Sequence, residues 1–447
     1  MGLNFVNITK SCFVTVTTFF AFVTYVNAES LSAMVDGLLA GHEDIVNAQK
    51  ELEEAGRDVT DAYLAYAPDL GIKMETGYAE KKDVDAPSEK FFETWDLTWD
   101  QKIMDSGKTR TDIKNKKLSL DKQELEYVSS RNDLLIEAAD AYLGLIKASE
   151  KLQTSITSEA NTRQTSGQEE IRVQVGSGLA SDVLKSKRQL ANAQKQVINN
   201  EKSYQSAVWT YEKLFNVEGA DAGSLNKPRL AASTLNFLPN SMEETVVLAL
   251  MYNRDLLISA IDVEIARLDI ATAMAGFGPT LDAAFSYKNK NDAAHVAGNH
   301  YEGEAKVTFD FPLSAIYMEM PSYMNDRSAL DRTINDHAVK ERDTVKAAKD
   351  AWQEYANSRT MLSYSENEAA IAKELLTIAQ AERAADQTDA AAVLSAEETY
   401  RGSLDDLSDD SMTLITSVYD VLDVIGMLEP DMVEDTKPVG TFNTSAE

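Results

Sequence analysis

Acidic side chains occupy alternate positions in short segments of this 447-residue chain, and they are its most chemically suggestive residues. Apolar or aromatic residues lie between them, so an extended strand would place the acids on one face. A row of carboxylates on a water-facing surface attracts cations and repels anions. The acids concerned are Asp96, Asp100, Asp282, Glu302, Glu304 and Asp310, with Lys288 and Lys306 among them. Two interpretations follow: the lining of a cation-tolerant aqueous pore, or the solvated face of an ordinary sheet.

Residues suited to catalysis or metal binding lack the spacing that such chemistry needs. The four histidines, His42, His295, His300 and His337, do not fall at metal-ligand intervals. Nucleophile elbows, glycine-rich phosphate loops and zinc-helix motifs do not occur in the sequence. Cys12 is the only cysteine, so a disulfide framework is excluded. We therefore expect no enzymatic activity, no cofactor and no bound metal.

The composition favours long elements in an acidic, exported protein. The net charge of −30 disfavours nucleic acid as a partner, because binding to phosphates needs a basic surface. Hydrophobic residues make up 44% of the chain, which is enough to bury a core. Only 9 prolines and 20 glycines occur, so few positions interrupt regular structure.

The first 28 residues have the pattern of a cleaved signal peptide. Lys10 precedes an apolar, threonine-rich run from Cys12 to Val26, and Ala28 supplies a small residue at the cleavage boundary. A retained membrane helix is the alternative, but the run is too short to span a bilayer. Later segments lack eighteen consecutive apolar residues, so we expect strands or a surface helix to make any membrane contact of the mature chain.

Several unlike motifs recur about 210 positions later, which indicates a duplicated unit. We predict a first repeat at 29–235, a second at 236–429, and a flexible acidic tail at 430–447. The matching pairs are His42-Glu43-Asp44-Ile45 with Asn253-Arg254-Asp255-Leu256, Pro68-Asp69-Leu70 with Pro279-Thr280-Leu281, and Leu97-Thr98-Trp99-Asp100 with Val307-Thr308-Phe309-Asp310.

Each repeat is predicted to contain a helix, two strands and two very long helices, in that order. The first helices cover Leu31 to Tyr66 and Met242 to Ala275, and Pro68 and Pro279 end them. Alternation of apolar and polar residues predicts strands at about 70–78, 91–101, 281–288 and 301–311. Long helices follow at about 106–216 and 322–428, and polar loops at 79–90 and 289–300 join the strands. Val183, Leu190 and Val197 repeat every seven residues, which predicts coiled-coil packing.

The apolar face of these strands is rich in aromatic residues, as a lipid-facing surface would be. The aromatic residues expected to face lipid are Tyr78, Trp95, Trp99, Phe285, Tyr287, Phe309 and Phe311. Four strands cannot close a membrane barrel, because the smallest barrels use about eight. A barrel must therefore be shared between chains. Two hairpins packed against a helical body of the same chain are the soluble alternative.

This arrangement resembles the TolC-like outer-membrane efflux protein family, and the most specific local match is Val175-Gly176-Ser177-Gly178-Leu179-Ala180-Ser181-Asp182-Val183. The resemblance implies a mainly α fold with a small β part, built from two tandem repeats of helix, β-hairpin and long helical hairpin. It implies a homotrimer whose chains form a 12-stranded β-barrel in the outer membrane and an α-helical barrel in the periplasm.

The resemblance also implies a function and partners. The chain would be the passive exit duct of a tripartite system for small-molecule efflux or type I protein secretion. An inner-membrane pump would deliver cargo through a periplasmic adaptor that docks on the hairpin tip. The tip residues are Val175, Gly176, Ser181, Asp182 and Val183. A periplasmic or secreted coiled-coil scaffold without channel activity is the alternative function.

The second hairpin tip departs from the family pattern. Ala392 and Ser395 stand where acidic residues are expected, while Asp386 and Asp389 lie three residues apart nearby. We expect these two aspartates to share a helix face and to form a displaced acidic constriction. The alternative is a solvated turn whose residues favour the start of a helix.

Overall fold

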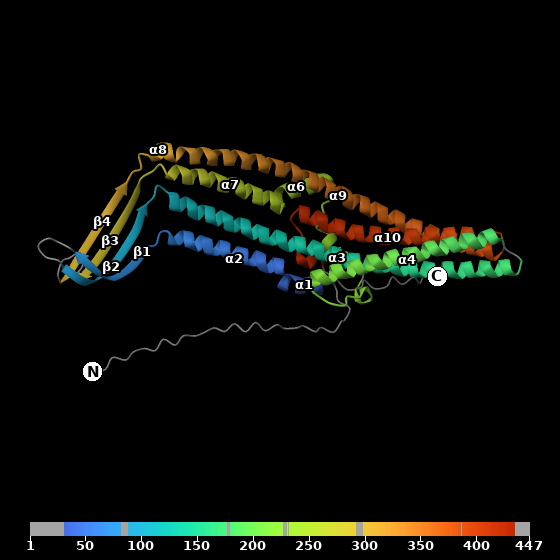
Figure 1. Cartoon of the computed structure of the whole chain (residues 1–447). Coiled ribbons are helices and arrows are strands. Elements are labelled where there is room, and N and C mark those ends of the chain that lie inside the picture. Colours follow the sequence, from blue (N-terminus) through green and yellow to red (C-terminus); the bar gives the residue numbers. More distant parts are fainter. Residues whose placement is uncertain are drawn as a thin grey trace.

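The computed structural model describes residues 31–81, 88–176, 179–226, 230, 232–291, 298–385 and 387–433. The predicted signal peptide lies outside the described residues. A four-stranded sheet lies at one end of a long helical body, and two helical hairpins form the other end (Figure 1). The two longest helices are α3 (Lys108–Gln174) and α9 (Met320–Ala384), and each is about 100 Å long at 1.5 Å per residue.

The first helix of each repeat is broken, so the prediction of one continuous helix was wrong. The first repeat has α1 (Leu31–Gly41) and α2 (Glu43–Leu64), and the second has α6 (Met242–Tyr252) and α7 (Arg254–Ala275). His42 and Asn253 lie at the two breaks. The His42 ring accepts from the Asp44 amide at 3.3 Å, and the Asn253 side chain accepts from the Leu256 amide at 3.0 Å. A side chain that caps a new helix competes with continuation of the old one.

The sheet joins the two repeats edge to edge. Its strands are β1 (Asp69–Lys81), β2 (Ser88–Met104), β3 (Thr280–Asn291) and β4 (Asn299–Asp310), and all neighbours are antiparallel in the order β1-β2-β3-β4. The β2–β3 pairing places Leu97 opposite Tyr287. The first hairpin is longer than predicted, since ladder pairing continues past Tyr78 and Phe91. Backbone pairing does not require the apolar alternation that ended the prediction.

The helices form one row of neighbours, and the members of this row change along the length of the body. Near the sheet, α3 lies between α2 and α7, and α7 packs against α9. Toward the tips, α3 packs against α4 (Ala180–Phe215) and α10 (Ala390–Val424), and α10 packs against α9. In the described part of the chain, no helix combines the length and apolarity needed to cross a membrane.

The main hydrophobic core lies midway along the body. Tyr142 and Leu145 of α3 pack there with Val418 and Leu422 of α10, and all four are fully or almost fully buried. Short elements cover this core, namely η1 (Ala222–Ser224), α5 (Ala232–Leu235) and η3 (Pro430–Val433), while α8 (Ala315–Met318) precedes α9.

The chain beyond α10 is folded against this core as far as residue 433, which corrects the start of the predicted tail at 430. The Asn132 amide, fully buried, donates to the Leu428 carbonyl at 3.1 Å. Arg131 pairs with Glu429 at 2.9 Å, and Thr234 donates to the Met432 carbonyl at 2.9 Å. The rest of the predicted tail, residues 434–447, lies outside the described residues.

Small polar residues lie between the helices both toward the tips and beside the main core. Ser166 of α3 and Ser186 of α4 are hydrogen-bonded at 3.1 Å, and Ser358 of α9 and Ser417 of α10 at 3.0 Å. All four are nearly fully buried. Small residues in the seam allow close helix approach, while their hydroxyl groups stay hydrogen-bonded.

Candidate conduit surfaces

The first hairpin exposes its apolar face more than its polar face, which is the reverse of a hairpin packed in a soluble core, and β4 is exposed on both faces. In β2, Phe91 is 73% exposed and Leu97 38%, whereas their polar-face neighbours Thr94 and Thr98 are partly covered. Ile72 of β1 is 74% exposed. An apolar face of this extent in water would drive association.

The predicted aromatic residues share this apolar face. Trp99 lies opposite Leu70 and Phe285, Trp95 lies opposite Met74, and Phe309 lies opposite Leu281. Tyr78 pairs across the ladder with Phe91, which sequence reasoning left out of the lipid-facing set although it shares the alternation. Tyr287 stacks on Tyr301 with ring centroids 6.1 Å apart, and Phe311 is half-exposed just beyond β4. Phe309 is 64% exposed, whereas Trp99 is partly buried.

The predicted charges share the opposite face. The register places Lys73, Asp96, Lys288 and Glu302 in one row across all four strands, and Lys288 and Asp96 form an ion pair at 3.3 Å. Alternating signs within this row offset part of the negative field that the sequence predicted. The remaining acids lie in other rows of the same face: Asp100 beside Ala284, Asp282 beside Thr308, Glu304 beside Ser286, and Asp310 beside Thr280.

Phe92 also lies on the polar face and was missed by sequence reasoning. A methyl group added to Gly77 would meet its ring at 2.9 Å, so the ring covers the glycine of the neighbouring strand. The signal was present in the sequence, because Phe92 is in phase with Asp96 and out of phase with Trp95.

Both outer strands have an unpaired edge. β1 pairs with β2 and β4 pairs with β3, so the free edges of β1 and β4 carry backbone donors and acceptors without ladder partners in the chain as described. Such groups in lipid cost several kcal/mol each, as an order of magnitude. The sheet is therefore incomplete as a membrane structure.

The tip of the first hairpin presents apolar side chains to solvent. Val175 is 72% exposed at the end of α3, and Gly176 turns the chain with φ +80°, which glycine adopts without strain. Ser181 is exposed, Asp182 pairs with Lys185 at 3.2 Å, and Val183 is half-buried. Sequence reasoning missed the other exposed apolar residues of this tip, which are Ile171, Leu179 and Leu184. The docking role of the tip stays a prediction.

At the second tip, Asp389 lies at the start of a helix and not within one. Asp389 is the N-cap of α10, in extended conformation, and its carboxylate accepts from the Ala392 amide at 2.9 Å. The helix-face argument was therefore wrong for Asp389, since a residue that caps a helix lies outside it. Asp386 lies outside the described residues, so the acidic constriction stays a prediction.

An ion pair joins the two hairpins near their tips. Arg383, in the last turn of α9, contacts Glu169 of α3, and Glu169 is 2% exposed. Arg383 also donates to the Thr388 carbonyl at 2.9 Å. One side chain thus connects α9, α3 and the loop before α10. The sequence offered no signal for this pair, because the two residues are 214 positions apart.

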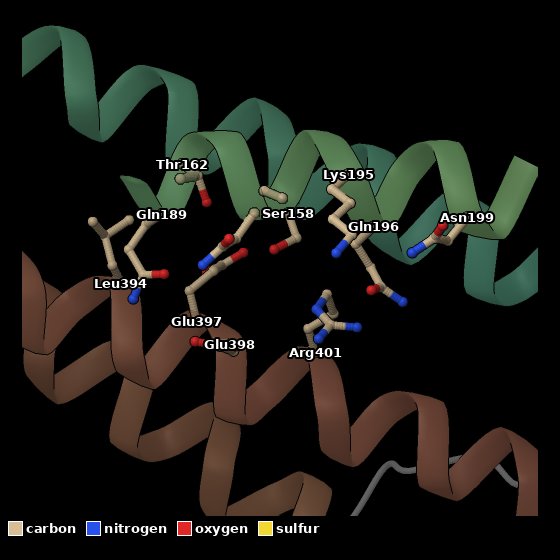
Figure 2. Close-up of a pocket in the computed structure, with 12 residues that line it drawn as sticks. Ser158, Thr162, Gln189, Lys195, Gln196, Asn199, Leu394, Glu397, Glu398 and Arg401 are labelled. Carbon is tan, nitrogen blue, oxygen red and sulfur yellow. The ribbon is translucent and has the colours of Figure 1, made fainter. Parts of the chain in front are cut away.

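Further polar contacts continue this seam between α3 and α10. Asn161 donates to Glu397 at 2.8 Å, and Lys151 pairs with Asp409 at 2.7 Å. Beside them, a hollow of about 260 Å³ lies between α4 and α10 and is also lined by Ser158 and Thr162 of α3 (Figure 2). Polar side chains from both helices point into it, including those of Gln189, Gln196 and Arg401. The two helical hairpins are therefore joined here by polar contacts. Water can replace such contacts more readily than it can replace the contacts of an apolar core.

Carboxylates from α3, α9 and α10 lie close together near the C-terminal end of α10. Burial among the helices raises the pKa of Asp420 to about 6, although the side chain reaches solvent, and Asp140, Asp423 and Glu354 add to the rise through their charges. Burial also raises the pKa of Asp140. The folded chain therefore binds more protons here than the unfolded chain between pH 3.8 and about 6.

We expect Asp420→Asn to stabilise the protein at neutral pH. Because the folded-state pKa is raised, ionisation of this group weakens the fold as the pH rises from 3.8 to about 6. At pH 7 the variant should gain about 1 kcal/mol, a value reduced from the full shift because solvent screens the group. Thermal unfolding followed by circular dichroism measures this gain. The same comparison at pH 4 is the control, and an equal gain there would contradict the assignment.

The comparisons with known proteins agree with this architecture. The family model described as "Outer membrane efflux protein" matches residues 34–216. The predicted resemblance to outer membrane efflux proteins is confirmed. The chain is 23% identical over 279 residues to the outer membrane protein TolC of Vibrio cholerae. This match covers 61% of the chain and 62% of that relative, which is less than two thirds of its length.

Solved structures show the same fold over most of the chain. The outer membrane protein VceC from Vibrio cholerae matches with a TM-score of 0.75 and 15% identity, covering 89% of this chain and 96% of that one. The Campylobacter jejuni CmeC outer membrane channel matches with a TM-score of 0.76 and 14% identity, covering 89% and 86%. The chain therefore shares the mainly α fold with a small antiparallel sheet that these two outer membrane proteins have.

Proposed function

We propose that this chain is one third of a passive exit duct that crosses the outer membrane and extends into the periplasm. The observation that carries the proposal is the sheet, which has an exposed apolar face, a charged opposite face and two unpaired edges. Head-to-tail association through β1 and β4 would satisfy both edges and turn the apolar faces toward lipid. A scaffold in water would leave the same faces exposed to aggregation.

The helices support a continuous duct below the sheet. Each chain ends at its tips about 100 Å from the sheet, a length suited to crossing an aqueous compartment. Three chains, the number that the family resemblance implies, would give twelve strands. The exposed apolar tip at Val175 and Leu184 fits a periplasmic adaptor linked to an inner-membrane pump. No catalytic step is proposed for such a duct.

Fractionation and conductance together test the proposal. We expect the protein to require detergent for extraction from the outer membrane, to run as a heat-sensitive trimer, and to conduct ions in planar bilayers. A freely soluble periplasmic monomer without conductance would contradict it.

A further inference from the structure

Cations are concentrated where α3 leaves the sheet. From Lys108 to Lys122 the chain has six basic and two acidic residues, although its net charge is −30. The segment begins four residues after Met104, which lies opposite Leu281 at the end of the apolar face. The first turns of α3 therefore carry positive charge directly next to the surface that is proposed to face lipid.

The cations nearest the sheet lack the acidic partners that other cations of α3 have. Arg110 and Lys114 are exposed, and within the described part of the chain no carboxylate pairs with either of them. Lys117 is also exposed, and its ammonium group lies over the ring of Tyr63, 5.3 Å from the centroid. The cations of α3 that form ion pairs are Lys116, Lys122, Arg131, Lys147, Lys151 and Arg163.

The three cations without a carboxylate partner share one face of the helix. Arg110, Lys114 and Lys117 follow one another at intervals of four and three residues, which places them side by side on the helix surface. Like charges at these intervals repel each other and weaken a helix. Lys108 and Asp112 lie on the opposite face, where opposite charges four residues apart attract. An anion bound from outside the chain would remove the repulsion among the three cations.

Counting turns along α3 shows in which direction this face points. Eighteen residues make five full turns, so Lys114 lies in line with Asn132 and Lys117 in line with Leu135. Asn132 donates to the carbonyl of Leu428, in the segment between α10 and η3. Leu135 is buried in the main hydrophobic core, which α1 and η1 cover where they contact α3. The three cations therefore point to the side of the helix row on which these covering elements lie.

This side of the row is the outer side of the proposed duct. The row of α2, α3, α7 and α9 would form part of the duct wall near the sheet. The elements that cover the main core would fill the bore if they lay on its inner side. They must therefore lie on the outer side, and Arg110, Lys114 and Lys117 point outward with them.

The three cations lie at the depth of phospholipid head groups. At 1.5 Å per residue, Arg110, Lys114 and Lys117 are about 3, 9 and 14 Å beyond the first residue of α3. Head groups occupy about 5–8 Å on each side of the hydrocarbon core, and long basic side chains extend toward charged groups at its border. Tyr63 is 49% exposed beside Lys117, and tyrosine is enriched at membrane interfaces.

We propose that Arg110, Lys114 and Lys117 bind the phosphate groups of anionic phospholipids in the periplasmic leaflet of the outer membrane. The inference rests on the proposed duct, which places the sheet in that membrane and the helices in the periplasm. An acidic peptide would be attracted by the same charges, but exposed Met104 and Tyr63 nearby favour a ligand that also has acyl chains. Binding would neutralise this face and set the depth of the duct in the bilayer.

Retention of lipid by the full-length protein in detergent tests the proposal. Phosphatidylglycerol and phosphatidylcholine with the same acyl chains are added, and native mass spectrometry counts the lipids that stay bound to the trimer. The unaltered protein should retain phosphatidylglycerol in preference to phosphatidylcholine. In the triple variant Arg110→Gln, Lys114→Gln, Lys117→Gln this preference should fall at least about tenfold, since each cation near an anionic surface adds to binding.

Three cations of α4 supply the matched control. Arg188, Lys195 and Lys202 are exposed, and they lie toward the tips, far from the sheet. The variant Arg188→Gln, Lys195→Gln, Lys202→Gln removes the same charge from the chain and should keep the preference for phosphatidylglycerol.

The outcomes separate the lipid site from the function, because bilayer conductance is measured on the same samples. If conducting trimers form without a preference for phosphatidylglycerol, or if both triple variants keep it equally, the lipid site is overturned while the duct stands. If the variant near the sheet alters ion selectivity and keeps the preference, the cations face the bore and the lipid site is again overturned. If neither trimers nor conductance are found, the proposed function itself fails.

Discussion

Replacing Arg383 by alanine is expected to loosen the tip end of the bundle and raise the single-channel conductance several-fold. The substitution removes the cation that contacts buried Glu169 and the donor to the Thr388 carbonyl. An unpaired buried carboxylate costs about 3–5 kcal/mol. Hydration of Glu169 relieves this cost, and hydration requires that α3 and α9 move apart.

Bilayer recordings at low salt measure this opening, and the thermal stability of the proposed trimer should fall in parallel. Arg359→Ala is the matched control, because it removes an exposed arginine from the same helix. The double variant Glu169→Gln with Arg383→Gln should bring the conductance back toward that of the unaltered protein, since two neutral amides can still hydrogen-bond. Equal conductance of Arg383→Ala and Arg359→Ala would contradict the expectation that this ion pair holds the tip end of the bundle together.

The second large effect is expected from Leu97→Arg, which should prevent stable insertion into the outer membrane. Leu97 lies on the apolar face in the row that contains Ile72 and Tyr287. A guanidinium near the centre of a bilayer costs about 2–4 kcal/mol per chain on the lipid face of a barrel. In the proposed trimer this cost arises three times.

Thr98→Arg supplies the matched control. Thr98 follows Leu97 directly but lies on the polar face, beside Ser286 and Gly71. Its arginine would reach water, so the variant should insert normally and change the ion selectivity of the pore. Membrane fractionation and heat-modified gel mobility compare the two. Loss of insertion in both variants, or in neither, would show that the two faces do not differ in their surroundings.

The sequence predicted those features that repeat along the chain. Alternation assigned Trp95 and Asp96 to opposite faces, and the register of the sheet agrees. The matched motifs that indicated the duplication begin at His42 and Asn253, which are also the positions of the helix breaks. These two residues differ in type although both cap a helix, so the match did not indicate a break. A helix period continues across such a break, so periodicity alone does not detect it.

Features that depend on contacts between distant segments were not predicted. Glu169 and Arg383 meet only because α3 and α9 end at the same height. Asp389 was assigned to a helix face from its spacing, whereas its side chain bonds to the backbone of the following helix. Residue spacing describes one helix at a time and carries no information on which helices are neighbours.

The pairing of β2 with β3 has a consequence for export. If the chain is exported as proposed above, Leu97 has no Tyr287 beside it until part of the second repeat has also crossed the inner membrane. During that interval the first hairpin exposes its apolar face and the edge of β2 that later pairs with β3. Chains that expose such surfaces are prone to aggregate. Assembly of the proposed duct therefore requires that the first repeats of different copies stay apart until the second repeat of each copy is available for pairing.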